Sequence, residues 1–419
     1  MTLDPVHFDG IARLARNVSH DVDESEHREV AATVWAELLD PLWDDGRVVL
    51  EPLGDLRRRS TEIDDVALRG GEFETTHGLD SGTINPTTFK NGLVLDVAQA
   101  AMAACPSDLE LHRERTIVMT AHTGDPASDL DTDWQNEDEG YCRQRFIQVP
   151  RVNRYEEAVV HALALYLAES KHALGNADEV EDLLYLDGPL YPTGMLNWLD
   201  RDPELRQLLV DEDLPRDVVR NYVRLVERFV GRDVPLVGFV KNPGAKAITR
   251  TLRKKTTAPW VDDAALFRQI LERHEEVGGE LQRRTDQLTF TSWFRSRGGT
   301  DRVFSQDGED LDVDRELDPE AYEVTFCVIY DPREDVVFRL EAPYAFTRDE
   351  DRREALVRQA LTEIAAERGP PLAVRKADDL ARISRDEKES LRTTLERQFD
   401  SERHRSYDDV RWDDVDRDE

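Results

Sequence analysis

The order of apolar segments between residues 75 and 241 constrains the fold of this chain more than any other feature of its sequence. The stretches Gly92–Ala104 and Leu111–His122 are apolar enough for buried strands, and they complete a group of three strands that begins near residue 75. Four further segments follow: a helix at 154–175, a strand at Asp182–Leu186, a helix at 213–231 and a strand at Pro235–Lys241. Strands that alternate with helices after an antiparallel opening predict an α/β fold with a mixed sheet flanked by helices. This is the element order of ribonuclease-H-like proteins.

The same patterns divide the chain into three parts. Residues 1–70 are predicted to form an N-terminal helical and β extension, with helices over 11–42. Residues 71–399 form the main domain, which contains a turn at Gly78–Thr83 and a polar insertion near 299–320. An additional C-terminal α/β part of this domain comprises helices at 244–255, 262–283, 349–367 and 384–399 and a strand hairpin over Glu323–Tyr330 and Asp335–Leu340. Residues 400–419 form an acidic tail.

The acidity of the chain has two possible explanations. Asp and Glu number 89 against 55 Lys and Arg, which gives a formal net charge of −34. High charge combined with low hydrophobicity is typical of disordered chains, but 39% of the residues are hydrophobic and they gather in apolar runs. We therefore interpret the acidity as adaptation to a cytoplasm of very high salt. Because the Debye length is roughly 3 Å at about 1 M salt, the net charge does not exclude a nucleic acid as a partner.

The cysteines and the N-terminus indicate a soluble cytoplasmic protein. The three cysteines are far apart and have neither the spacing of a metal site nor the even number of a disulfide framework. The N-terminal residues lack the basic and apolar regions of a signal peptide. No apolar run reaches the length of about 18 residues that a membrane span needs, so we expect no membrane association.

Three acidic residues stand in apolar surroundings. Asp80 follows Leu79, Asp187 ends a buried strand, and Glu169 faces the apolar side of the helix at 154–175. A buried carboxylate is costly unless it is paired, hydrogen-bonded or bound to a metal. The joint placement of these acids predicts a metal site.

Each acid also has a simpler interpretation. Asp80 and Asp187 could accept hydrogen bonds from the backbone of a turn, because each precedes turn-forming residues. Glu169 could form a surface ion pair with Lys171 or Arg151. No single acid therefore establishes the site.

Basic residues are concentrated in one segment. Half of the eight lysines lie between Lys241 and Lys255. Lys246, Arg250 and Lys254 recur at intervals of four residues and so share a helix face. In so acidic a chain, this local excess predicts that Lys241, Lys246, Arg250 and Lys254 contact the phosphate backbone of DNA. The alternative is an ordinary solvated helix face.

At this point the sequence resembles the NurA family of archaeal nucleases, in a haloarchaeal version. The first motif is His77-Gly-Leu-Asp80-Ser-Gly-Thr83, and the second is Leu183-Leu-Tyr-Leu-Asp187-Gly-Pro-Leu190, with Glu169 in the helix before it. Further blocks are Val234–Lys241, Phe338-Arg-Leu-Glu341-Ala-Pro343 and Gly369-Pro-Pro-Leu372 leading to Asp378. Many family members carry a histidine where this chain has Asp378 or Asp379. A carboxylate also binds a hard cation, so the metal site is expected to survive.

The resemblance implies both site residues and function. Asp80, Glu169 and Asp187 are the implied catalytic residues, and with Asp378 they are the implied ligands of Mn²⁺ or Mg²⁺. Arg339 and Glu341 lie on the same side of a strand and could be either a structural pair or part of the site. The resemblance further implies a homodimer with a HerA-type hexameric ATPase partner. Its implied activity is 5′ to 3′ exonuclease cleavage, with single-strand endonuclease cleavage, of DNA ends in double-strand-break repair. The alternative is a catalytically weak adaptor that clamps DNA for the ATPase.

Overall fold

The main sheet has a ribonuclease-H-like strand order, which agrees with the fold class expected from the sequence. The computed structural model describes residues 5–19, 24–125, 130–306, 308 and 311–404. The core strands are β4 (Thr76–Thr83), β6 (Val94–Cys105), β7 (Arg115–His122), β10 (Leu184–Asp187) and β11 (Leu236–Val240). They lie in the order β7-β6-β4-β10-β11. The first three are antiparallel, whereas β10 runs parallel to β4 and β11 parallel to β10. The predicted mixed α/β sheet is confirmed.

Two predicted elements are wrong. Gly78–Thr83 is not a turn, because the whole of β4 pairs with β6 from Thr76 to Thr83. The helix predicted at 262–283 ends early: α11 covers Asp263–Leu271, and a hairpin of β12 (His274–Val277) and β13 (Glu280–Arg283) follows. Gly278 and Gly279 connect the hairpin with φ of 65° and 91°, the left-handed backbone that two-residue hairpin turns need.

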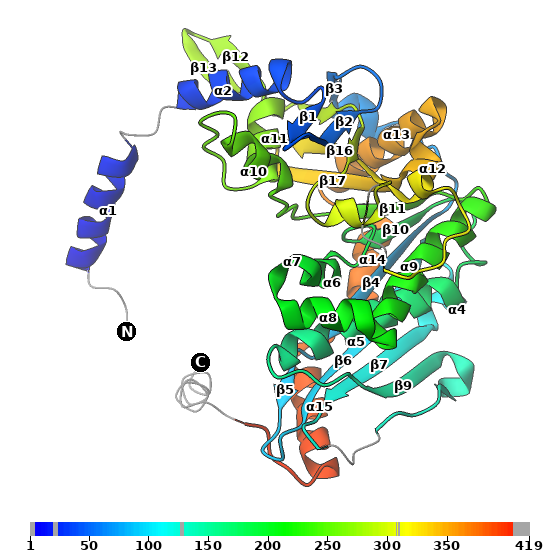
Figure 1. Cartoon of the computed structure of the whole chain (residues 1–419). Coiled ribbons are helices and arrows are strands. Elements are labelled where there is room, and N and C mark those ends of the chain that lie inside the picture. Colours follow the sequence, from blue (N-terminus) through cyan, green and yellow to red (C-terminus); the bar gives the residue numbers. More distant parts are fainter. Residues whose placement is uncertain (1–4, 20–23, 126–129, 307, 309–310, 405–419) are drawn as a thin grey trace.

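Helices cover both faces of the core strands (Figure 1). On one face lie α5 (Glu156–Gly175) and α9 (Asp213–Gly231), which match the predicted helices. Alanines of β6 face α5, and their small side chains let the helix approach the sheet closely. On the other face lie α14 (Leu372–Ala381), which packs on β4 and β6, and α15 (Arg385–Gln398). The sheet continues through β9 (Cys142–Gln148) and β8 (Gln135–Glu137), and short β5 (Thr87–Thr88) pairs with β6.

The same sheet continues past β11 into a second lobe (Figure 1). Its strands are β17 (Val336–Pro343), β16 (Val324–Asp331), β15 (Phe294–Ser296), β14 (Gln287–Thr291), β3 (Arg58–Glu62), β2 (Arg47–Pro52) and β1 (Leu42–Asp44). One face is covered by α2 (Glu24–Glu37), α10 (Ala247–Arg253) and α11, and the other by α3 (Ile63–Ala67) and α13 (Glu350–Glu367). The strands of the N-terminal extension therefore join the main sheet.

The remaining elements are short connections, apart from α1. They are α1 (Pro5–Ser19), α4 (Leu109–Arg113), η1 (Asp138–Gly140), α6 (Thr193–Leu196), α7 (Trp198–Arg201), α8 (Pro203–Asp211), η2 (Gly299–Phe304), η3 (Pro319–Tyr322) and α12 (Tyr344–Thr347). The acidic tail from residue 405 lies outside the described residues. None of the described helices is both long and apolar enough to cross a membrane.

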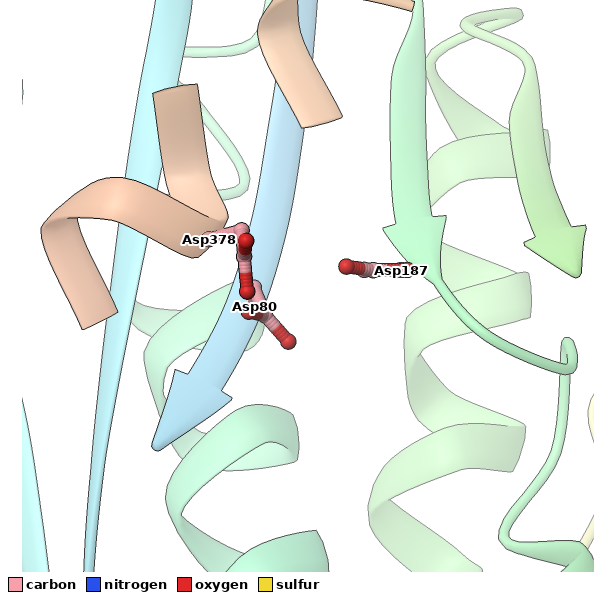
Figure 2. A group of neighbouring side chains, drawn as sticks. All are labelled: Asp80, Asp187 and Asp378. Carbon is pink, nitrogen blue, oxygen red and sulfur yellow. The ribbon is translucent and has the colours of Figure 1, made fainter. Parts of the chain in front are cut away.

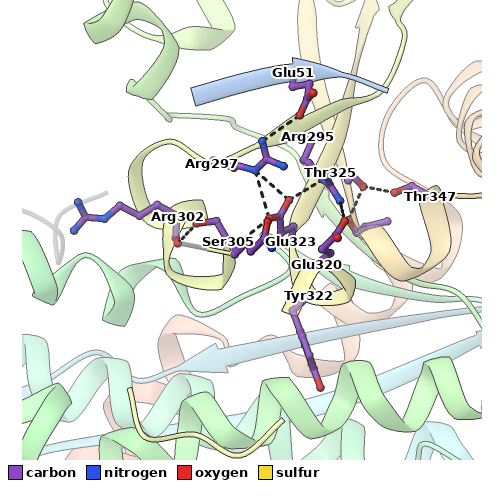
Figure 3. Close-up of polar contacts among 12 residues, drawn as sticks. Glu51, Arg295, Arg297, Arg302, Ser305, Glu320, Tyr322, Glu323, Thr325 and Thr347 are labelled. Atoms are coloured by element: carbon purple, nitrogen blue, oxygen red, sulfur yellow. Dashed lines mark hydrogen bonds and ion pairs between the residues drawn. The ribbon is translucent and has the colours of Figure 1, made fainter. Parts of the chain in front are cut away.

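A buried charge network fixes the predicted polar insertion to the sheet (Figure 3). Glu323 is fully buried, and its carboxylate lies 2.7 Å from Nε of Arg295 and 3.3 Å from Nε of Arg297. It also accepts a hydrogen bond of 3.0 Å from the backbone N–H of Gln306, within the insertion. A buried carboxylate with two cations and a backbone donor is fully compensated. The network is therefore structural.

Candidate metal centre

The position of Asp80 depends on the glycines on either side of it. Gly78, Asp80 and Gly82 point to the same face of β4, because side chains alternate along a strand. Helix α14 lies directly on this face. A Cβ atom at Gly78 would overlap the backbone of Ala373, and one at Gly82 would overlap that of Ala381. The two glycines thus let α14 contact the strand, and this contact brings Asp378 to Asp80.

The carboxylates of Asp80, Asp187 and Asp378 form one cluster (Figure 2). One oxygen from each lies within 4.8 Å of the others, and Asp187 points across the gap toward the other two. Asp187 ends β10, whose parallel register pairs Leu186 with Leu79 and so sets Asp187 beside Asp80. Three carboxylate oxygens at this spacing are suitable ligands for a hard divalent cation.

Electrostatics favours a cation at this cluster. Burial, together with the charges of Asp187 and Glu169, raises the pKa of Asp80 to about 8. Burial also raises the pKa of Asp187, although Nζ of Lys241 lies only 2.5 Å from its Oδ2. Like charges held together disfavour the ionised form of each carboxyl. A bound cation would remove this penalty.

Glu169 lies beside the cluster and is not one of its three members. Its Oε1 accepts a hydrogen bond of 2.6 Å from the hydroxyl of Ser81, and its Oε2 accepts one of 2.9 Å from Tyr222. Burial raises its pKa. The surface pairing considered from the sequence is wrong, since Lys171 donates instead to Asn221 at 3.3 Å. Glu169 belongs to α5, and through Ser81 it is bonded to the residue that follows Asp80 in β4.

The four predicted DNA contacts fall in two places. Lys241 directly follows β11 and forms the ion pair with Asp187, inside the site. Lys246 and Arg250 are exposed at the start and middle of α10. Lys254 is also exposed, but its Nζ lies 2.7 Å from Asp44 and 3.3 Å from Asp45. Arg339 and Glu341 are buried and paired at 2.7 Å, and Glu341 accepts from the N–H of Leu190, so this pair is structural.

Sequence reasoning missed α14, the helix that carries Asp378. Two signals could have revealed it. Pro370 and Pro371 precede Leu372, and proline is common where a helix begins. The alternation of Gly78, Asp80 and Gly82 indicates a strand face on which another backbone lies closely.

The fold and the cluster together define a class. A ribonuclease-H-like sheet with aspartates on its two central parallel strands is the arrangement of ribonuclease-H-like α/β nucleases. The NurA domain signature matches residues 74–383, most of the chain, so the chain belongs to the NurA family. The resemblance to the NurA family seen in the sequence is confirmed. No curated protein matches the chain in sequence.

Solved structures of the family cover between 80% and 98% of the chain. The NurA nuclease from Sulfolobus solfataricus is 10% identical, with 94% of this chain and 97% of that chain covered and a TM-score of 0.47. A NurA structure with dAMP and manganese is 11% identical, with 98% and 99% covered and a TM-score of 0.42. A NurA structure with manganese is 10% identical, with 80% and 93% covered and a TM-score of 0.39.

Proposed function

We propose that this protein is a metal-dependent deoxyribonuclease that hydrolyses phosphodiester bonds at DNA ends. One observation carries the proposal: three aspartates from β4, β10 and α14 meet within 4.8 Å, on a chain of the NurA family. Family members have been crystallised with manganese. Mn²⁺ is therefore the first ion to test, with Mg²⁺ as the second, because both accept carboxylate oxygens.

The chain's own residues have separable roles in this proposal. The cation would be held by Asp80, Asp187 and Asp378. Glu169 would be a further ligand, or it would orient Ser81, whose hydroxyl donates to it. Bound divalent ions activate a water molecule and stabilise the leaving oxygen of a phosphodiester. Lys241 would hold Asp187 in place and add positive charge for the phosphate. Tyr222 and Ser81 keep Glu169 fixed by donating to both of its oxygens.

Family membership supports the biological setting that we propose. The protein would act as a homodimer, cutting 5′ to 3′ with single-strand endonuclease activity, in double-strand-break repair. A HerA-type ATPase would supply ATP-driven movement, and the sequence itself contains no Walker-type Gly-x-x-x-x-Gly-Lys-Ser/Thr motif. Light scattering of the protein alone and copurification with the ATPase test these two associations.

A cleavage assay tests the catalytic proposal directly. The full chain is incubated with duplex and single-stranded DNA, labelled at either end, with Mn²⁺ or with EDTA. We expect products only with the metal, and the labelled end that is lost first reports the polarity. Binding without any cleavage in Mn²⁺ or Mg²⁺ would reject the nuclease and leave the adaptor that clamps DNA for the ATPase.

The close contact between β4 and α14 gives a first prediction. Gly78→Ala should push α14 away from the strand and separate Asp378 from Asp80, because the new methyl group overlaps backbone atoms. Overpacking of this kind costs about 1–3 kcal/mol. We expect a lower melting temperature and a smaller further stabilisation by Mn²⁺, both measured by thermal melting. Gly70→Ala is the matched control, since nothing lies near that position. Equal Mn²⁺ stabilisation in both variants would contradict this role of the glycines.

The basic face of α10 gives a second prediction. If Lys246, Arg250 and Lys254 line the DNA path, glutamate at all three should weaken binding to every sequence alike, because phosphate contacts carry no sequence information. Binding is measured at the lowest salt at which the protein stays folded, since salt reduces such contacts. Lys254 also pairs with Asp44, so the double variant of Lys246 and Arg250, which keeps this pair, is the control for stability. Unchanged binding in the triple variant would make α10 a solvated face.

A further inference from the structure

A large open groove adjoins the metal centre, and none of its lining residues belongs to α10. It has a volume of about 1500 Å³, and Asp80 and Asp378 are among the residues that line it. Its walls are the loop 85–88, which includes β5, and the first turns of α15. Small-molecule pockets are usually about 300–1,000 Å³, so this groove has room for an extended chain.

Beyond the two aspartates of the metal centre, the groove carries a small excess of positive charge, although the protein as a whole is strongly acidic. Apart from the two aspartates, it is lined by five basic side chains and three acidic ones. The basic residues are Arg382, Arg385, Lys388, Arg392 and Arg403. The chain as a whole carries a net charge of −34. A local excess of cations next to catalytic carboxylates indicates a polyanionic ligand.

Two of these cations are placed for phosphate contacts. Arg382 follows the last residue of α14, and its backbone N–H donates to the carbonyl of Asp378 at 2.9 Å, so it lies one helical turn beyond a ligand of the metal centre. Lys388 is in the first turns of α15. Within the described part of the chain, neither side chain forms an ion pair. By contrast, Arg392 donates to Thr87 and to the carbonyl of Ile84, which holds the loop against α15.

We propose that this groove holds the phosphate backbone of a single DNA strand on one side of the scissile bond, with Arg382 and Lys388 as the contacts. This inference rests on the proposed function and adds a path for the substrate. Among the described residues that line the groove, none is Phe, Tyr or Trp, so bases have no aromatic side chain on which to stack. The strand is therefore held by its backbone and without sequence preference.

Salt-dependent binding of a single strand tests the groove. A fluorescent oligothymidylate of about 12 nucleotides, within the usual range of single-strand sites, is titrated with the full chain in EDTA. Each phosphate contact contributes about 0.7 to the slope of log K against log salt, so Arg382→Gln with Lys388→Gln should reduce that slope by about 1.4. We expect the Kd at the lowest usable salt to rise about tenfold. Arg348→Gln with Arg397→Gln removes the same charge from exposed sites outside the groove, and should leave both values unchanged.

The outcomes separate this proposal from the others. Parent-like affinity and slope in the groove variant overturn it, as does a parent protein that does not bind the strand. Circular dichroism of each variant shows whether folding is retained, and Lys388→Gln alone should reduce the slope by about half as much. If the groove variant weakens binding but the parent never cleaves DNA, strand binding in the groove is supported and the proposed nuclease activity is rejected. If the parent cleaves DNA, its kcat/KM for a long strand divided by its kcat/KM for a dinucleotide gives a reference ratio. We expect this ratio to be lower in the groove variant.

Discussion

Asp80→Asn is expected to reduce Mn²⁺-dependent DNA cleavage to background. Loss of groups that only orient metal ligands typically costs 10–100-fold, so loss of a carboxylate at the centre of the cluster should cost at least about 100-fold in rate. Asparagine keeps the shape of the side chain and removes its charge, so the fold should remain intact. End-labelled DNA with Mn²⁺ is the assay. Asp379→Asn, on the exposed side of the same helix, is the matched control and should retain activity.

The same variant should be more stable than the parent when no metal is present. The pKa of Asp80 is raised to about 8 in the folded protein, whereas an unfolded chain has an Asp pKa of about 3.9. The folded state therefore binds the proton more tightly, and ionisation destabilises the parent as pH rises from about 4 to about 8. We expect the gain in melting temperature in Asp80→Asn to be small at pH 5 and several degrees at pH 8. Full activity in Asp80→Asn, or a gain that shrinks as pH rises, would contradict this assignment of the site.

Transfer to low salt is expected to unfold or aggregate the protein. A net charge of −34 repels itself when screening is lost, and the Debye length grows from roughly 3 Å at 1 M to about 10 Å at 0.1 M salt. Circular dichroism melts at about 0.1 M and about 3 M KCl measure the effect. Sorbitol at matched osmolality is the control, because it does not screen charge. The same cooperative melt in both KCl solutions would show that the acidity is not an adaptation to salt.

The sequence predicted the core of the fold well because its signals there are local. The periodicity of α5 and α9 and the apolar runs of β6, β10 and β11 are each contained in one segment. The placement of Asp187 at the end of β10 followed from its strand alone. For these elements burial and hydrogen bonding agree with local preference, so reading the chain segment by segment was sufficient.

The rest depended on contacts between distant segments. The turn-forming residues of β4 become a strand because β6 supplies a continuous hydrogen-bonding partner, and this tertiary context outweighs the local preference of Gly and Ser. The charge cluster on α10 looked uniform in the sequence, yet Asp44 engages Lys254 from more than two hundred residues away. The cations of the groove come from the residue that follows α14, from α15 and from the segment near residue 403, which no local pattern connects.

The contact between Asp80 and Asp378 also bears on how the protein is made. A ribosome synthesises β4 early, but α14 emerges only after almost the entire chain has been translated. Until then the strand face at Gly78 and Gly82 has no helix on it, and the third carboxylate does not exist. A nascent chain, or one shortened by a premature stop codon, would therefore carry two of the three aspartates and no complete centre. Under the proposed function, unfinished copies would therefore lack cleavage activity, because the last helices of the fold complete the centre.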